Sequence, residues 1–249
     1  MQPIVLYDLA NTQPPERRAI SGNTWKARLA LNYKGLPVKT EWVDPPDIEA
    51  LYHKLSVEPA VKRPDGTPYC SLPLIYDPST NTHVSDSYKI ALYLDKTYPA
   101  TPPLFPRGTL AFHQVFQQTA TELATAALLL RVATFCSRLS ERAQARFRPR
   151  NEQMFGGPLE SLCSEVQWEK AEKLWAGFAA VLEANGEGKN NLIMGDQVCF
   201  ADLQVAAMLA AARNTLGAES EQWKRMCGWQ GGKWARFLDQ FSQYTVMDV

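Results

Sequence analysis

The positions of apolar and polar residues divide the chain into two parts with different periodicities. Over the first hundred residues, short apolar segments alternate with helical patterns in the order β-α-β-α-β-β-α. The predicted strands cover residues 3–7, 37–43, 72–76 and 83–84, and the predicted helices cover residues 24–34, 44–54 and 86–98. The segment 56–70 holds three prolines and a Pro-Asp-Gly turn, so we expect it to be irregular.

A proline-rich segment marks the point where the pattern changes. Four prolines occur between Pro99 and Pro106, which predicts a linker over residues 99–108. Helical periodicity dominates beyond it, over residues 109–147, 162–183, 201–216 and 232–241. The sequence therefore predicts an α/β domain over 1–98 and an all-helical domain over 109–249.

The composition argues against several classes of partner. The chain has 26 basic and 26 acidic residues, so its net charge gives no reason to expect nucleic acid or an anionic membrane. Its longest apolar run, Ala124–Leu130, is too short to span a bilayer. The N-terminus has no basic region followed by a long apolar run, and we predict a cytoplasmic protein.

Cysteine and histidine are scattered along the chain. The five cysteines are widely spaced and form no CxxC motif, and the three histidines are equally dispersed. Neither a disulfide framework nor a metal site is predicted from these spacings.

The most informative segment is Ile20–Lys34. Ser21 stands just before a predicted helix that opens with Thr24-Trp25-Lys26 and follows a strand. A hydroxyl at this place lies beside free helix N–H groups and the positive end of the helix dipole, which suits an anion such as a thiolate. Serine also caps helices well, so the segment alone leaves both interpretations open.

Taken together, these features resemble a known family. The element order, with Pro73 opening the third strand, resembles the thioredoxin fold, and the linker and helical domain extend this resemblance to the soluble glutathione transferases. The segment Ser21–Arg28 is similar to the serine-type active-site motif of that superfamily. The segments Leu31–Pro37 and Glu41–Val43 resemble the fungal branch related to bacterial beta-etherases.

The resemblance implies roles for individual residues. It implies that glutathione is the co-substrate, that Ser21 donates its hydroxyl to the glutathione sulfur, and that Asn23 donates a second bond. It also implies that Pro73 is cis and that Leu72 offers its backbone N–H and C=O to the cysteinyl part of the tripeptide. No metal takes part.

The remaining part of the predicted site comes from Asp86 and Ser87. By resemblance, the helix N-terminus at Ser87 receives the γ-glutamyl carboxylate and Asp86 pairs with the α-ammonium group. Asp86 stands where the family commonly has the longer glutamate, and both residues also suit an ordinary N-cap. His53 and Lys62 are our candidates for the glycyl carboxylate, against a solvated surface role.

The predicted electrophile pocket combines Tyr7 with Phe112 and Phe116 of the first helix after the linker. Core packing explains the two phenylalanines equally well. A further motif, Cys199–Leu203, resembles the buried capping box of the family with cysteine in place of the usual hydroxyl residue. Because a thiol is a poor acceptor, we expect Asp202 to supply half of that cap.

Two functions follow from the resemblance. The first is a transferase that delivers the glutathione thiolate to aromatic or benzylic electrophiles, by conjugation or by displacement at an ether or thioether. The second is a ligandin that binds aromatic molecules such as plant polyphenols without turnover. Thiol–disulfide exchange is disfavoured because no cysteine precedes Cys70. The resemblance also implies a homodimer and a role in detoxification.

Overall fold

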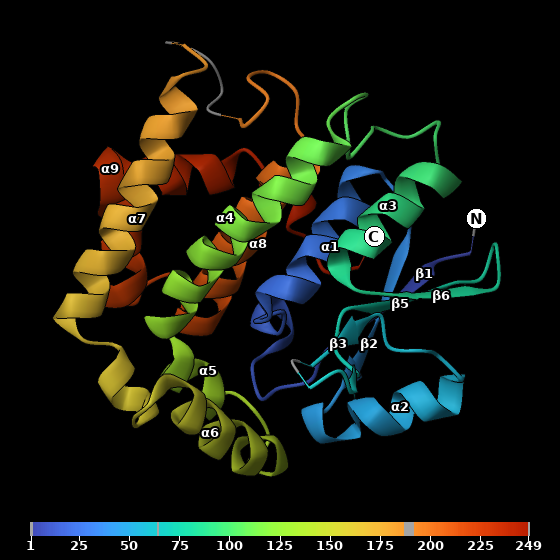
Figure 1. The fold of residues 1–249 in the computed structure, drawn as a ribbon, viewed down its shortest axis with the longest axis horizontal. Coiled ribbons are helices and arrows are strands. Elements are labelled where there is room, and N and C mark those ends of the chain that lie inside the picture. Colours follow the sequence, from blue (N-terminus) through green and yellow to red (C-terminus); the bar gives the residue numbers. More distant parts are fainter. Residues whose placement is uncertain (1, 64, 187–191, 249) are drawn as a thin grey trace.

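The computed structural model describes residues 2–63, 65–186 and 192–248. A sheet with its helices forms one half of the molecule and a bundle of longer helices forms the other (Figure 1). This arrangement confirms the predicted fold class, a thioredoxin-like N-terminal domain followed by an all-helical C-terminal domain.

The first half is built on a four-stranded mixed sheet. The strands are β1 (Ile4–Leu9), β2 (Val38–Val43), β3 (Val61–Lys62), β4 (Pro68–Tyr69), β5 (Leu74–Asp77) and β6 (Thr82–Ser85). The main sheet has the order β2-β1-β5-β6, with β1 parallel to β2 and antiparallel to β5. Ile4, Leu6 and Ile75 are fully buried because helices cover these central strands.

Three helices accompany this sheet. They are α1 (Gly22–Tyr33), α2 (Ile48–Leu55) and α3 (Ser87–Thr97), with 3-10 turns at Pro15–Arg17 and Pro45–Asp47. Gly35 follows α1 with a φ of 65°, as expected for the residue that ends a helix in the left-handed conformation.

The segment 56–70 corrects one prediction, because it is not wholly irregular. Val61 pairs with Tyr69 and Lys62 with Pro68 in a short antiparallel hairpin. Asp65 accepts hydrogen bonds from the N–H and hydroxyl of Thr67, which closes the turn. The hairpin reaches the helical domain, since a guanidinium nitrogen of Arg150 lies 3.2 Å from the Tyr69 hydroxyl.

The second half contains six helices in its described part. They are α4 (Leu110–Leu129), α5 (Val132–Ser137), α6 (Glu141–Phe155), α7 (Glu165–Glu183), α8 (Phe200–Leu216) and α9 (Glu221–Asp239), with 3-10 turns at Leu159–Leu162 and Ser242–Tyr244. Nearly every side chain of α8 is buried, so this helix forms the centre of the bundle. None of the helices in the described residues is long and apolar enough to span a membrane.

Two helical predictions are corrected here. The stretch predicted over 109–147 is three helices, with Ser140 accepting a hydrogen bond from the Ala143 N–H to start α6, which then continues through Pro149. Helix α9 begins eleven residues before the predicted 232, because Ser220 caps it and accepts from the Trp223 N–H. The backbone angles of Trp229–Gly232 are not helical, and because of this break the periodicity did not indicate the first half of α9.

The two halves meet where α1 lies against α8. A Cβ placed on Gly22 would lie 3.9 Å from both the Ala211 Cβ and the Met208 Cα, so the start of α1 sits close to the α8 backbone. The C-terminal tail returns to the other side of α1, where the Asn32 side-chain amide donates to the carbonyls of Tyr244 and Val246. Helix α1 is therefore held between the helical domain and the tail.

Candidate functional site

The start of α1 carries the serine predicted from the sequence. Ser21 is the N-cap residue, with extended backbone angles, and its Oγ accepts from the Thr24 N–H at 3.4 Å. The Thr24 hydroxyl donates back to the Ser21 carbonyl at 3.0 Å, which fixes the turn. Capping uses the Ser21 oxygen as an acceptor, so its hydroxyl hydrogen stays available for a second partner.

Asn23 and Lys26 extend this turn toward α3. The Lys26 ammonium donates to the Asn23 side-chain oxygen at 3.1 Å, so the amide hydrogens of the exposed Asn23 can act as donors to another group. Burial lowers the pKa of Lys26, and the negative charge of Asp86 opposes that change. A carboxylate on α3 therefore acts on the first turn of α1, which brings two separately predicted motifs together.

The third predicted motif, Leu72–Pro73, is connected to Asp86 by a backbone hydrogen bond. The Leu72–Pro73 peptide bond is cis, as predicted, and the Asp86 N–H donates to the Pro73 carbonyl at 3.3 Å. Asp86 has a φ of 76° and a ψ of 126°, which is unusual for a residue with a side chain. Strained backbone of this kind concentrates at functional sites, where the surrounding structure holds it in place.

The N-terminus of α3 differs in detail from a simple anion site. One carboxylate oxygen of Asp86 accepts from the N–H groups of both Tyr88 and Lys89, at 3.0 Å each. The capping role left open by the sequence is thus present. In the described structure the N–H and hydroxyl of Ser87 take no hydrogen-bond partner, so these two groups are the ones that can receive a carboxylate.

The two candidates for the glycyl carboxylate are not brought together. His53 lies on the solvent side of α2 and Lys62 lies on β3, both exposed. The buried residue of that helix is Tyr52, whose hydroxyl donates to the Ser71 carbonyl at 2.7 Å. A surface groove of about 590 Å³ runs between residues 56–60 and residues 81–85, with Lys89 at its edge. The roles of His53 and Lys62 stay predictions.

The structure does not bring the residues of the predicted electrophile pocket into one cluster. Tyr7 packs with Tyr52, Leu72 and Leu74, on the α2 side of the sheet. Phe116 is 6% exposed and contacts Phe178 of α7, so it belongs to the interior of the helical domain.

Phe112 also lies apart from Tyr7. It is 40% exposed and stacks on Phe116 with ring centroids 5.9 Å apart. Side chains on opposite sides of a sheet and bundle do not line one cavity, and the residue pattern alone did not separate them.

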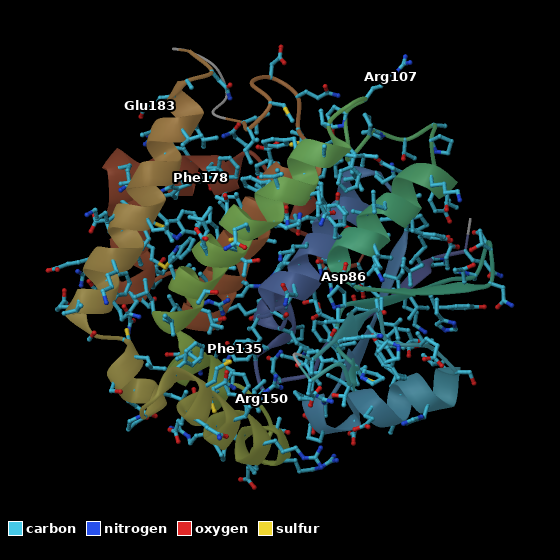
Figure 2. The ribbon with its side chains drawn as sticks, in the orientation of Figure 1. Asp86, Arg107, Phe135, Arg150, Phe178 and Glu183 are labelled. Atoms are coloured by element: carbon cyan, nitrogen blue, oxygen red, sulfur yellow. The ribbon has the colours of Figure 1, made fainter. Side chains whose placement is uncertain are left out.

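The helical residues that do reach the serine segment were missed. Ile20, directly before Ser21, packs with Phe135 of α5, and its carbonyl accepts from buried Arg131 at 3.4 Å. Figure 2 labels Phe135 on the helical side and Asp86 on the sheet side. One signal was present in the sequence, since Arg131 is a lone charge that follows the apolar run Ala124–Leu130.

Comparison with known proteins agrees with this geometry. Residues 20–97 match the model of the glutathione S-transferase N-terminal domain, and residues 110–244 match that of the glutathione S-transferase C-terminal domain. The chain therefore belongs to the glutathione S-transferase family. Membership of this family confirms the expectation that glutathione is the co-substrate.

Individual relatives are fungal proteins. Glutathione transferase GSTFuA3 from Phanerochaete chrysosporium is 44% identical, with a TM-score of 0.95 and 100% of both chains covered. CsGST63524 of Ceriporiopsis subvermispora, solved in complex with glutathione, is 38% identical with a TM-score of 0.91 over 99% of both chains. The glutathione S-transferase-like protein ustS of Aspergillus flavus is 30% identical, over 84% of this chain and 79% of its own length. The expected likeness to the fungal branch is thereby confirmed.

Proposed function

We propose that this chain is a serine-type glutathione transferase in which the Ser21 hydroxyl donates a hydrogen bond to the glutathione sulfur. The observation that carries the proposal is the Ser21 Oγ at the N-cap of α1, 3.4 Å from the Thr24 N–H. A thiol with a pKa of about 8.5 is mostly protonated at neutral pH, and hydrogen bonds and positive potential at the sulfur favour the thiolate. Asn23 supplies a second donor from the same turn.

The rest of the tripeptide fits the groups beside this turn. We assign the backbone of Leu72 to the cysteinyl unit, the N–H and hydroxyl of Ser87 to the γ-glutamyl carboxylate, and Asp86 to the α-ammonium group. The bond between the Asp86 N–H and the Pro73 carbonyl supports this assignment because it ties two of these elements together. His53 and Lys62 remain the proposed contacts of the glycyl carboxylate.

We further propose that the acceptor substrate is an aromatic or benzylic electrophile. In the reaction the sulfur–carbon bond forms while the bond from that carbon to its leaving group breaks, and the leaving group takes the electron pair. Support comes from Phe147, which is half-buried beside Ile20 and has its ring centroid 5.3 Å from that of the buried Phe135. Aromatic side chains at this place suit a flat aromatic ligand near the sulfur.

One pair of variants separates catalysis from helix capping. Ser164 caps α7 with the same geometry as Ser21, since its Oγ accepts from the Gln167 N–H at 3.4 Å. Ser21→Ala and Ser164→Ala should each cost about 1 kcal/mol of stability. Only Ser21→Ala should raise the pKa of enzyme-bound glutathione, read from thiolate ultraviolet absorption, and lower turnover with benzyl and aryl electrophiles. Equal thiol pKa values in the two variants would contradict the proposal.

Binding without turnover is the second candidate function. A groove of about 330 Å³ lies between α4 and α7, lined mainly by apolar groups that include Ala126, Leu129 and Leu174. A groove of this size and lining suits one aromatic molecule such as a polyphenol. Two results together would favour a ligandin. Such a molecule should displace a bound aromatic dye from the Ser21→Ala variant, and the wild-type chain should turn over none of the electrophiles in the same panel.

The association state and cellular role are also proposals. Leu110, Phe112 and Val115 at the start of α4 are 52%, 40% and 75% exposed, a cluster that suits contact with a second copy. Sedimentation should therefore give a homodimer that Val115→Glu dissociates. We propose a cytoplasmic location and a role in detoxification, which cell fractionation and the sensitivity of a deletion strain to electrophiles would test.

A further inference from the structure

Arg131 is a buried cation at the junction of α4 and α5. Arg131 is 6% exposed, and its Nη1 donates to the Thr215 hydroxyl at 2.6 Å and to the Ile20 carbonyl at 3.4 Å. Within the described residues no carboxylate lies within 4.0 Å of this guanidinium, and its Nε has no hydrogen-bond partner. The Phe135 ring, 5.8 Å from its Cζ, offers a cation–π contact but no counter-charge. An ion removed from water without a counter-charge is costly, so this buried arginine needs a further reason.

Arg131 belongs to a group of contacts that fix the segment before Ser21. The Ala19 carbonyl accepts from the Asn214 amide at 3.0 Å and from the Trp25 indole N–H at 2.7 Å. Arg17 in turn donates to the Asn214 carbonyl at 3.2 Å. The peptide that leads into the serine is therefore held by the last turn of α8, and Arg131 contacts its final carbonyl.

A simpler explanation is that Arg131 only stabilises the C-terminus of α8. Cations at helix C-termini gain a modest stabilisation, even when they are partly buried. That gain explains the contact with Thr215, but it is smaller than the cost of burial and does not account for the contact with Ile20. Burial lowers the pKa of Arg131 to about 10, so the side chain still carries its charge at neutral pH.

We propose that Arg131 is a positioning residue for the thiolate site: its guanidinium orients the Ile20–Ser21 peptide and its charge favours the anionic form of the glutathione sulfur. This inference rests on the proposed function of Ser21. The thiol loses its proton to water, and the resulting negative charge is the counter-charge that Arg131 lacks among the described protein groups. Lys26 adds a second positive charge near the start of α1, and Asp86 is the negative charge that faces Lys26.

Substitution of Arg131 tests the proposal. Arg131→Met should raise the pKa of enzyme-bound glutathione by about one unit, and Arg131→Lys should raise it by less because the charge remains. The corresponding fall in kcat should be about tenfold at acidic pH and should disappear at alkaline pH, with a smaller change in KM for glutathione. The control is Lys233→Met, which also removes a buried cation that donates to a carbonyl, here that of Ala179 at 3.0 Å, although Lys233 has a carboxylate oxygen of Glu183 at 3.6 Å.

Two further outcomes keep the test decisive. If Arg131→Met does not fold, Thr215→Val removes the hydroxyl that orients the guanidinium and should raise the thiol pKa in the same direction by a smaller amount. If wild type lowers the thiol pKa of bound glutathione and the Arg131 and Thr215 variants keep that value, the role of Arg131 is overturned and that of Ser21 stands. If wild type itself does not lower it, both proposals fail.

Discussion

The ammonium group of Lys34 lies 2.7 Å from a carboxylate oxygen of Asp95, and this ion pair fastens the proline-rich linker to the α/β domain. Lys34 also donates to the Pro102 carbonyl at 3.1 Å. The same carboxylate accepts from the N–H groups of Leu104 and Phe105. The predicted linker is thus fixed to the α/β domain at several points, which sets the orientation of the helical domain against the site.

Asp95→Asn should destabilise the protein strongly. The amide keeps one acceptor oxygen but leaves the buried Lys34 ammonium without its counter-charge, which costs about 3 kcal/mol or more. Urea unfolding followed by tryptophan fluorescence measures this. Asp47→Asn, which breaks the exposed ion pair with Arg142, is the control and should leave the midpoint unchanged. Equal midpoints for both variants would contradict the anchoring role of Asp95.

His113→Leu should make the protein less sensitive to acid. His113 is fully buried beside Phe105 and neither ring nitrogen has a partner in the described structure, so burial lowers its pKa to about 4 from an ordinary value of 6.5. The unfolded chain therefore binds the proton first, and stability falls as pH drops from 6.5 to 4, by about 3 kcal/mol. Denaturation curves measured at several pH values across this range give the free energy of unfolding, which should depend less on pH in the variant. If the free energy of unfolding depends on pH as steeply in the variant as in wild type, the His113 ring has a hydrogen-bond partner in solution and its pKa is not lowered.

Asp86→Asn separates ligand binding from capping at α3. The amide oxygen of asparagine can still accept from the N–H groups of Tyr88 and Lys89, so stability should stay within about 0.5 kcal/mol of wild type. Loss of the negative charge should weaken glutathione binding at least about tenfold, because a charge-assisted bond to the α-ammonium group is lost. Calorimetry with glutathione measures the change. Unaltered affinity would leave Asp86 as a cap alone.

Cys199 provides a prediction about the buried cap of α8. The sequence suggested that a thiol there is a weak acceptor, and in the structure the thiol instead donates to an Asp202 oxygen at 3.1 Å, while the Cys199 N–H donates at 2.9 Å. Cys199→Val should cost about 1 kcal/mol by removing that donor. Cys199→Ser should be neutral or stabilising by about 0.5 kcal/mol, since a hydroxyl both donates and accepts. Thermal unfolding should place Cys199→Val below wild type and Cys199→Ser at or above it.

The sequence by itself determined the features that depend on neighbouring residues. The order of the four main-sheet strands and of helices α1 to α3, the cap at Ser21, the turn at Gly35 and the Asp86–Ser87 helix start follow from local periodicity and backbone preferences. The resemblance carried by these motifs also indicated the family and the cis bond before Pro73. Local breaks were harder to predict, because the hairpin in 56–70 and the kink in α9 depend on partners that a single segment does not contain.

Only the tertiary structure decided which distant side chains reach the site. Arg131 and Ile20 are 111 positions apart in the chain, and their contact exists because α5 and the end of α8 pack against the segment before Ser21. Phe112 and Phe116 share one stripe of the predicted helix, yet Phe116 is buried against Phe178 and Phe112 is 40% exposed. Burial in a packed interior is a property of the whole fold, so the local pattern did not separate these two residues or assign Arg131 to the serine segment.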